Sequence, residues 1–196
     1  MPGIFEVLAE RISSVTSRQR SLIFKILSLI GGGMIFLMVF PFLLGAISKT
    51  ILGAIPEGAP LFVRYIIGIP CIAVGLGILI WAVKAFWSSG GGTPSPIAAP
   101  QLLVTTGPYR YCRNPIQLGA MILYFGMGAV ADSIIAGTGM CGLALILGTL
   151  YHSCIEEKEL QRRFGEQYLQ YRKRTPFLIP RFNLRAADKD SASPQC

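Results

Sequence analysis

Two long apolar runs constrain this chain more than any other feature of its sequence. Leu22 to Ser48 carries a single charge, Lys25 near its start, and Leu61 to Trp87 forms the second run. A helix of about 20 predominantly apolar residues crosses the hydrocarbon core of a bilayer. A helix is favoured there because it satisfies its own backbone hydrogen bonds. The sequence therefore predicts two transmembrane helices, the first of them kinked at Pro41.

Two further apolar runs follow each other closely. Asn114 is a favoured N-cap and Pro115 suits the first helical position, so a third helix is predicted to begin there and to end near Ala131. A fourth run extends from Ile134 to Cys154 after a short turn. Because the connection is short, these two helices are predicted to form an antiparallel hairpin. The predicted fold class is an all-α membrane protein with about four transmembrane helices.

The charged residues flank the apolar runs. Only 14% of the residues are charged and the net charge is +8, whereas soluble domains carry about 25% charged residues. Lysine and arginine concentrate in the N-terminal segment, in residues 88–114 and near the C-terminus. By the positive-inside rule, both termini are predicted to be cytoplasmic, in a bacterial inner membrane or the endoplasmic reticulum. The basic residues are expected to meet membrane lipids rather than nucleic acid, and the cysteines show no metal-binding spacing.

The chain divides into several parts by composition. Residues 88–100, rich in Gly, Pro and Ser, are predicted to form an extended loop, which is either a linker or one wall of a site. After the fourth run, an apolar stripe predicts a cytosolic amphipathic helix; its residues are Leu160, Phe164, Tyr168 and Tyr171. Residues 4–20 fit a short interfacial helix and a disordered tail equally well. The predicted parts are an interfacial segment (1–21), two transmembrane helices (22–87), a core with the hairpin (88–182) and a disordered tail (183–196).

Polar side chains mark the end of the hairpin where its two helices meet the same membrane surface. His152 and Glu156 share one helix face, and Glu157 is the next residue. Arg110 and Arg113 precede the third helix, where backbone N–H groups favour anions. These residues could equally be a solvated face and a positive-inside anchor. Used together, they would suit a zwitterionic ligand with an ammonium and a carboxylate.

One glycine pattern is assigned to packing instead of to a ligand. Gly137 to Gly142 matches G-x-G-x-x-G, but a dinucleotide site needs a preceding strand and a βαβ unit. Small residues in transmembrane helices permit close helix contacts. The motif is therefore predicted to pack helices together.

Two stretches together resemble the integral-membrane methyltransferases, which include isoprenylcysteine carboxyl methyltransferases and phospholipid N-methyltransferases. The first stretch runs from Leu103 to Gly119 and contains Gly-Pro-Tyr-Arg-Tyr-Cys-Arg-Asn-Pro. The second runs from Glu156 to Tyr171 and contains Glu-Glu and Phe-Gly-Glu-Gln-Tyr. The resemblance covers residues 88–181 and identifies residues 88–182 as the methyltransferase core.

The resemblance implies S-adenosylmethionine as the methyl donor, bound without a Rossmann fold. It implies a pocket lined by Gln101, Leu102, Leu103, Val104, Tyr109, Asn114, Pro115, Ile116 and Gln117, with Glu156 and Glu157 on the opposite side. Glu156 would receive the ammonium of the cofactor. His152 and Arg113 are the predicted catalytic residues.

The sequence departs from the family pattern at two positions. Gln117 stands where the family usually has tyrosine, so amide hydrogen bonds would replace an aromatic contact. His152 stands where the prenylcysteine enzymes have an arginine that handles a carboxylate. A neutral histidine could act as a general base for an amine, hydroxyl or thiol.

The predicted function is methyl transfer to a lipid-like or amphiphilic acceptor at the cytoplasmic membrane face, as in the prenylcysteine enzymes. Phospholipid N-methylation is one alternative. Two alternatives of other classes are an NADPH-dependent reductase of the sterol-reductase type and a non-catalytic membrane scaffold. The oligomeric state is left open.

Overall fold

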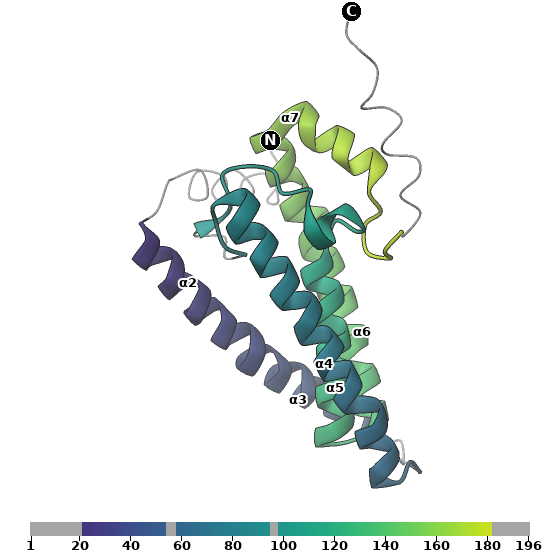
Figure 1. Cartoon of the computed structure of the whole chain (residues 1–196). Helices are drawn as coiled ribbons and strands as arrows, with labels where there is room; N and C mark the ends of the chain where they lie inside the picture. The colour runs from purple at the N-terminus through teal and green to yellow at the C-terminus, as the bar shows by residue number, and fades with distance from the viewer. Residues whose placement is uncertain (1–20, 54–57, 95–97, 182–196) are drawn as a thin grey trace, which may run out of the picture.

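The computed structural model of the protein describes residues 21–53, 58–94 and 98–181 (Figure 1). Every regular element in these residues is a helix or a helical turn. The predictions for residues 4–20 and 183–196 fall outside the described residues. The elements in chain order are α2 (Leu22–Met34), the π-turn η1 (Ile35–Val39), α3 (Phe40–Leu52), α4 (Leu61–Ala85), the π-turn η2 (Phe86–Gly90), the 3-10 turn η4 (Gly107–Arg110), α5 (Pro115–Ala131), α6 (Ile134–Tyr151), the π-turn η5 (His152–Glu156) and α7 (Glu157–Arg174).

Three continuous helices are long and apolar enough to cross a membrane. They are Leu22–Leu52, Leu61–Gly90 and Ile134–Arg174. The first continues beyond its predicted end at Ser48 and the second beyond Trp87, because neither position carries a helix-terminating residue. The third predicted helix, Pro115–Ala131, is apolar but shorter. Within the described residues, three of the four predicted spans are thus confirmed by length and composition. A membrane span formed by Pro115–Ala131 stays a prediction.

The kink predicted at Pro41 takes the form of the π-turn η1. In this turn the Phe40 N–H bonds to Ile35 O, five residues back. In the same register, Phe36 O would face Pro41, which has no N–H to donate. The Tyr124 hydroxyl of α5 donates to Phe36 O instead, at 2.7 Å. A partner helix therefore satisfies the carbonyl that the proline leaves free.

Glycines bring α4 and α5 into close contact. A Cβ at Gly75 of α4 would lie 2.6 Å from the Leu123 backbone nitrogen, and a Cβ at Gly68 would lie 3.0 Å from Gly126 O. Each helix contributes small residues seven positions apart, so the pairs recur along one face. Figure 1 shows α4, α5 and α6 side by side, whereas α2 diverges from them. The shared core consists of Leu44, Leu79, Ala120, Leu123, Tyr124 and Met140.

The predicted hairpin is confirmed. The Ser133 side chain accepts from the Ala136 N–H at 2.9 Å and caps α6. Arg64 of α4 donates to the terminal α5 carbonyls of Ala129 (2.9 Å) and Val130 (3.0 Å). A Cβ at Gly137 would lie 2.4 Å from Phe125 O, so the glycine motif begins at a helix-packing contact, as predicted.

The helix that begins at Ile134 continues past the membrane-like segment into α7 and then turns. Gly165 has φ 53° and ψ −127°, which interrupts the helical geometry. Figure 1 shows α7 changing direction across the end of the bundle. The break falls within the predicted apolar stripe: Leu160 and Phe164 precede it, whereas Tyr168 and Tyr171 follow it. The cytosolic amphipathic helix stays a prediction. The positive φ suits a residue without a Cβ.

Candidate functional site

The segment before α5 is fixed by contacts at several points. The Gln101 N–H donates to Gly90 O at 2.9 Å, and its side-chain Nε2 donates to Ala99 O at 3.1 Å. Arg163 of α7 donates to Pro100 O at 2.5 Å. Within the predicted lining, Val104 is buried, Leu103 is partly exposed and Leu102 is 66% exposed. The loop is therefore anchored to α7, but the Leu102 side chain is largely exposed.

Tyr109 lies buried in η4 and packs against Phe86, with ring centroids 4.8 Å apart. Its carbonyl accepts from the Tyr171 hydroxyl at 2.7 Å. Its own hydroxyl has no hydrogen-bond partner among the described residues. Burial chiefly, and the nearby Glu156 carboxylate next, raise the pKa of Tyr109 well above its usual value. Tyr109 is therefore a neutral, buried hydroxyl that can donate a hydrogen bond.

Arg113 and Glu157 form an ion pair. Each side chain is only 12% exposed. The same Arg113 nitrogen lies 3.4 Å from the Tyr168 hydroxyl, and Arg172 lies 3.3 Å from the second Glu157 oxygen. Both carboxylate oxygens of Glu157 therefore have cationic partners, and the charge of Arg113 is compensated within the protein.

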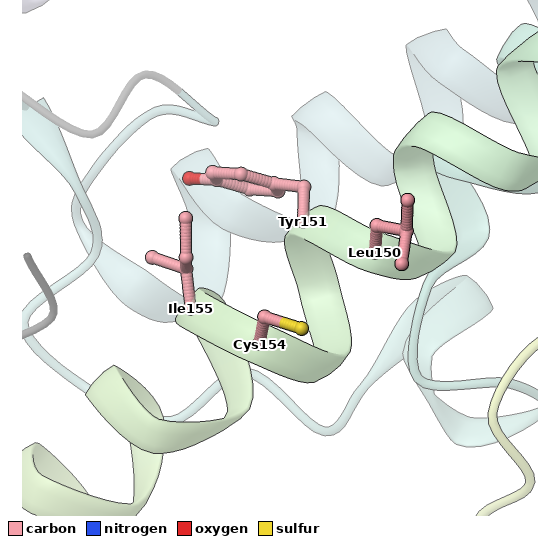
Figure 2. Close-up of a pocket in the computed structure, with 4 residues that line it drawn as sticks. All are labelled: Leu150, Tyr151, Cys154 and Ile155. Carbon is pink, nitrogen blue, oxygen red and sulfur yellow. The ribbon is translucent and has the colours of Figure 1, made fainter. Parts of the chain in front are cut away.

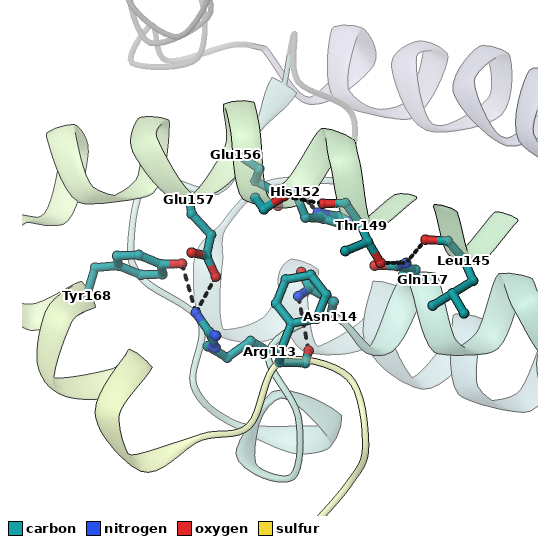
Figure 3. A network of polar contacts seen from close by, with 11 residues as sticks. Arg113, Asn114, Gln117, Leu145, Thr149, His152, Glu156, Glu157 and Tyr168 are labelled. Carbon is teal, nitrogen blue, oxygen red and sulfur yellow. Dashed lines mark hydrogen bonds and ion pairs between the residues drawn. The ribbon is translucent and has the colours of Figure 1, made fainter. Parts of the chain in front are cut away.

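His152 and Glu156 form a second pair one turn away, through Nδ1 of the ring and Oε2 of the carboxylate (Figure 3). They lie at the two ends of the π-turn η5, where the Glu157 N–H bonds to His152 O. An ionised carboxylate only accepts hydrogen bonds, so it favours the tautomer with hydrogen on Nδ1. The lone pair of Nε2 is then available to accept a proton.

Asn114 occupies the predicted N-cap position of α5 but does not cap it with its side chain. Instead its Nδ2 donates to Phe177 O at 3.0 Å. The side-chain cap predicted from the sequence is therefore wrong, because a tertiary contact outcompetes the local one. Pro115 is at the first helical position, as predicted, and is buried.

Gln117 is 5% exposed and connects α5 to α6. Its Nε2 lies 3.2 Å from Leu145 O and 3.2 Å from Thr149 Oγ1. Gly148 makes room for this amide, because a Cβ there would lie 2.7 Å from Nε2. The carbonyl oxygen Oε1 is buried without a hydrogen-bond partner among the described residues. The partly buried Ile116 packs against the shared core and against a second cluster of buried residues, which consists of Ala82, Ala85, Val104 and Tyr109.

Figure 3 shows the two charged pairs and the Gln117 amide in one region, where the start of α5 meets the end of α6. The structure thus brings together six of the thirteen predicted site residues; these are Arg113, Asn114, Gln117, His152, Glu156 and Glu157. Sequence reasoning missed Phe177, whose ring lies near Arg113 and His152. Pro176 and Pro180 exclude a helix around it, which was a signal that an extended segment follows α7.

An apolar hollow of about 280 Å³ lies on the surface next to His152 (Figure 2). Leu150, Tyr151, Cys154 and Ile155 line it. All four residues come from the end of α6 and from η5, and the Tyr151 ring packs edge-on against His152 with centroids 5.4 Å apart. His152 itself does not line the hollow, but its ring contacts the lining residue Tyr151.

Comparisons with known proteins point to one family. Residues 63–167 match the model of the phospholipid methyltransferase family. Over 84 residues the chain is 38% identical to the nickel-cobalt-cadmium resistance protein NccN of Alcaligenes xylosoxydans xylosoxydans, which covers 42% of this chain and 38% of that protein.

Two relatives carry the names of methyltransferases. The chain is 32% identical to methanethiol S-methyltransferase 2 of Bradyrhizobium diazoefficiens, over 44% of this chain and 32% of that protein. It is 34% identical to protein-S-isoprenylcysteine O-methyltransferase of Mus musculus, over 40% of this chain and 27% of that protein. These matches span less than half of each relative's length. The family model covers more than half of this chain, and the chain therefore belongs to the phospholipid methyltransferase family.

Proposed function

We propose that the protein transfers a methyl group from S-adenosylmethionine to a lipophilic or amphiphilic acceptor at the cytoplasmic membrane surface. The contact between His152 and Glu156, next to the Arg113–Glu157 pair, carries this proposal. It combines a proton acceptor with a carboxylate where two apolar helices end. Membership of a methyltransferase family supports the reaction type.

The residues present fit the proposed methyl donor. Glu156 is one-third exposed, and its carboxylate can receive an ammonium group in addition to the His152 contact. Of the four buried polar side-chain atoms without partners among the described residues, the Tyr109 hydroxyl and Gln117 Oε1 lie here and supply a donor and an acceptor, and Arg113 Nε is a further donor. Buried polar atoms are normally hydrogen-bonded, so these atoms favour a polar ligand. When bound, S-adenosylmethionine would supply a methyl group on a cationic sulfur.

His152 would then act as the general base. Its Nε2 would accept the proton that a thiol, amine or hydroxyl loses as the methyl group is transferred in a single displacement. Arg113 would act through Glu157, because its Nη1 is already paired with that carboxylate, although Nε has no hydrogen-bond partner among the described residues. The remaining contribution of the protein is to orient the two reactants and exclude water.

The apolar hollow supports a lipophilic acceptor. Leu150 and Tyr151 line it and are 55% and 40% exposed, and Ile146, one turn earlier, is 58% exposed. A hydrocarbon chain from the bilayer could follow this face of α6 to the region next to His152. The acceptor atom can be sulfur, oxygen or nitrogen. The phospholipid methyltransferase family model favours an amine as the second candidate, which would make the protein a phospholipid N-methyltransferase.

Binding of radiolabelled S-adenosylmethionine to the purified protein in lipid nanodiscs tests the proposal. We expect Glu156→Gln to weaken binding at least tenfold, because it removes the negative charge opposite the ammonium. Glu166→Gln, an exposed position on α7, is the matched control and should bind like the wild type. Absence of binding to the wild type, or equal binding by both variants, would favour a reductase or a scaffold. An acceptor screen with the same labelled donor would then identify the methylated compound.

A further inference from the structure

The described C-terminal residues, 175–181, return along the start of α5. Four hydrogen bonds hold this segment, here called the strap, against residues 111–114. The Arg113 N–H donates to Pro176 O at 2.8 Å, the Asn114 N–H donates to Phe177 O at 3.2 Å, and the Arg181 N–H donates to Tyr111 O at 3.1 Å. The Asn114 side chain adds the fourth, also to Phe177 O. Phe177 is therefore fixed by its backbone next to the site.

The Phe177 ring lies near one member of each charged pair, Arg113 and His152. Its centroid is 5.6 Å from the Arg113 guanidinium carbon. It is also 6.4 Å from the His152 ring centroid, with the ring planes at 76°. The ring thus connects Arg113, which pairs with Glu157, to His152, which pairs with Glu156.

Two successive carboxylates create a choice of partner for Arg113. Glu156 and Glu157 are neighbours in sequence, and a guanidinium can bind either carboxylate through its fork of N–H groups. If Arg113 moved to Glu156, that carboxylate would no longer orient His152 or receive an ammonium. The Phe177 ring lies near both the Arg113 guanidinium and the His152 ring, so Arg113 would give up its contact with the ring if it moved to Glu156. A guanidinium near an aromatic ring is also held there by the ring quadrupole.

We infer that Phe177 is a positioning residue, which keeps Glu156 paired with His152 and Arg113 paired with Glu157. It acts through these groups without taking part in the chemistry. The inference rests on the proposed function, in which His152 accepts a proton and Glu156 serves the methyl donor. It adds the strap to the catalytic site.

The ring of His152 reports directly on this role. His152 is the only histidine in the chain, so the imidazole ¹⁵N resonances of the full-length protein in nanodiscs belong to one residue. With every variant measured at the same pH, the wild type should show the tautomer with hydrogen on Nδ1. Phe177→Leu keeps an apolar side chain without the ring. It should lose this tautomer's signature and lower the rate of methyl transfer at least tenfold.

Matched variants separate positioning from general stability. Phe177→Tyr keeps the ring and should retain the tautomer, with a transfer rate within about threefold of wild type. Ile179→Ala, 81% exposed on the same strap, should leave both unchanged. If Phe177→Leu does not fold, Phe177→Met replaces it in the same comparison.

Three results would overturn the inference. They are an unchanged tautomer in the folded Leu or Met variant, loss of the tautomer in Ile179→Ala, and failure of Phe177→Tyr to retain it. The tautomer measurement needs no methyl transfer. An inactive wild type would therefore refute the proposed function, whereas the spectra would still decide the role of Phe177.

Discussion

His152 concentrates the proposed chemistry in one side chain, because Glu156 contacts its Nδ1 and leaves Nε2 for a substrate. We expect His152→Gln to retain binding of S-adenosylmethionine, since glutamine can still donate to Glu156. Methyl transfer should fall by about 10²- to 10⁴-fold, which is the usual contribution of a general base. Labelled-donor binding and transfer, measured on the same sample, check this. Full activity in the variant would exclude the base role.

Cys112 offers a test of the buried environment next to Arg113. The residue is 1% exposed, and burial raises the pKa of its thiol from 9.0 to about 11. The folded state disfavours the thiolate, so this group's contribution to stability is present below pH 9 and is lost as the pH rises towards 11.

We therefore expect Cys112 to resist iodoacetamide at about pH 8.5, because the thiolate is the reactive form. Mass spectrometry of the alkylated peptides would measure this. The same thiol should react fully after unfolding in detergent and urea, which is the control. Rapid labelling in the folded protein would contradict the buried placement.

Residue-level prediction succeeded where chemistry and spacing decide the outcome and failed where a distant partner does. The i, i+4 spacing of His152 and Glu156 was sufficient to predict that they share a face. The partner of Asn114 could not be predicted, because Phe177 O reaches it only through the strap. Gln117 was predicted to bind the cofactor, which stays a prediction. Its contacts to Leu145 and Thr149 depend on the space at Gly148.

At the scale of elements, the contact between α4 and α5 depends on the absence of side chains. We expect Gly75→Ala to destabilise the protein by about 1–3 kcal/mol, the usual cost of overpacking, since the new Cβ would lie 2.6 Å from the Leu123 backbone nitrogen. Gly77→Ala on the same helix is the control, because nothing lies within 4 Å of its Cβ position. Unfolding in mixed detergent compares them; equal stability of the two variants would contradict this packing.

The π-turn in the first helix gives a coupled prediction. Tyr124→Phe should cost about 1–3 kcal/mol, the penalty of an unsatisfied buried acceptor, because Phe36 O would lose its donor. In a Pro41→Ala background the backbone regains an N–H, so the same substitution should cost clearly less. A double-mutant cycle on unfolding free energies measures the difference. Strict additivity would show that Pro41 and Tyr124 do not share this carbonyl.

Local signals predicted the helices and the hairpin well, since apolar runs, Pro115 and the short turn at Ser133 act over a few residues. They did not predict the form of the bend before Pro41, because the choice of a π-turn depends on Tyr124 far along the chain. The break at Gly165 was missed for a related reason. Glycine is compatible with a helix interior, and only the packing of the following residues across the bundle selects its positive φ.

At the scale of the whole molecule, the orientation predicted from lysine and arginine is still a prediction. We expect a fluorescent reporter fused to either terminus to be active and alkaline phosphatase at the same positions to be inactive, because both ends should be cytoplasmic. Phosphatase fused after residue 58, between the first two predicted spans, is the positive control. Phosphatase activity at only one terminus would mean an odd number of spans. The proposed site and one chain end would then lie on opposite sides of the membrane.

The Arg64 contacts to Ala129 and Val130 imply an uneven distribution of rigidity along the bundle. At that end, a short turn, a capped helix and close glycine contacts leave few ways to open. At the other end, side chains and the strap join segments that are distant in sequence. Amide hydrogen exchange should therefore be slower around Ala129 than near Arg113. The protein would be most rigid at the turn between α5 and α6, and the proposed chemistry would lie at the opposite end of the bundle.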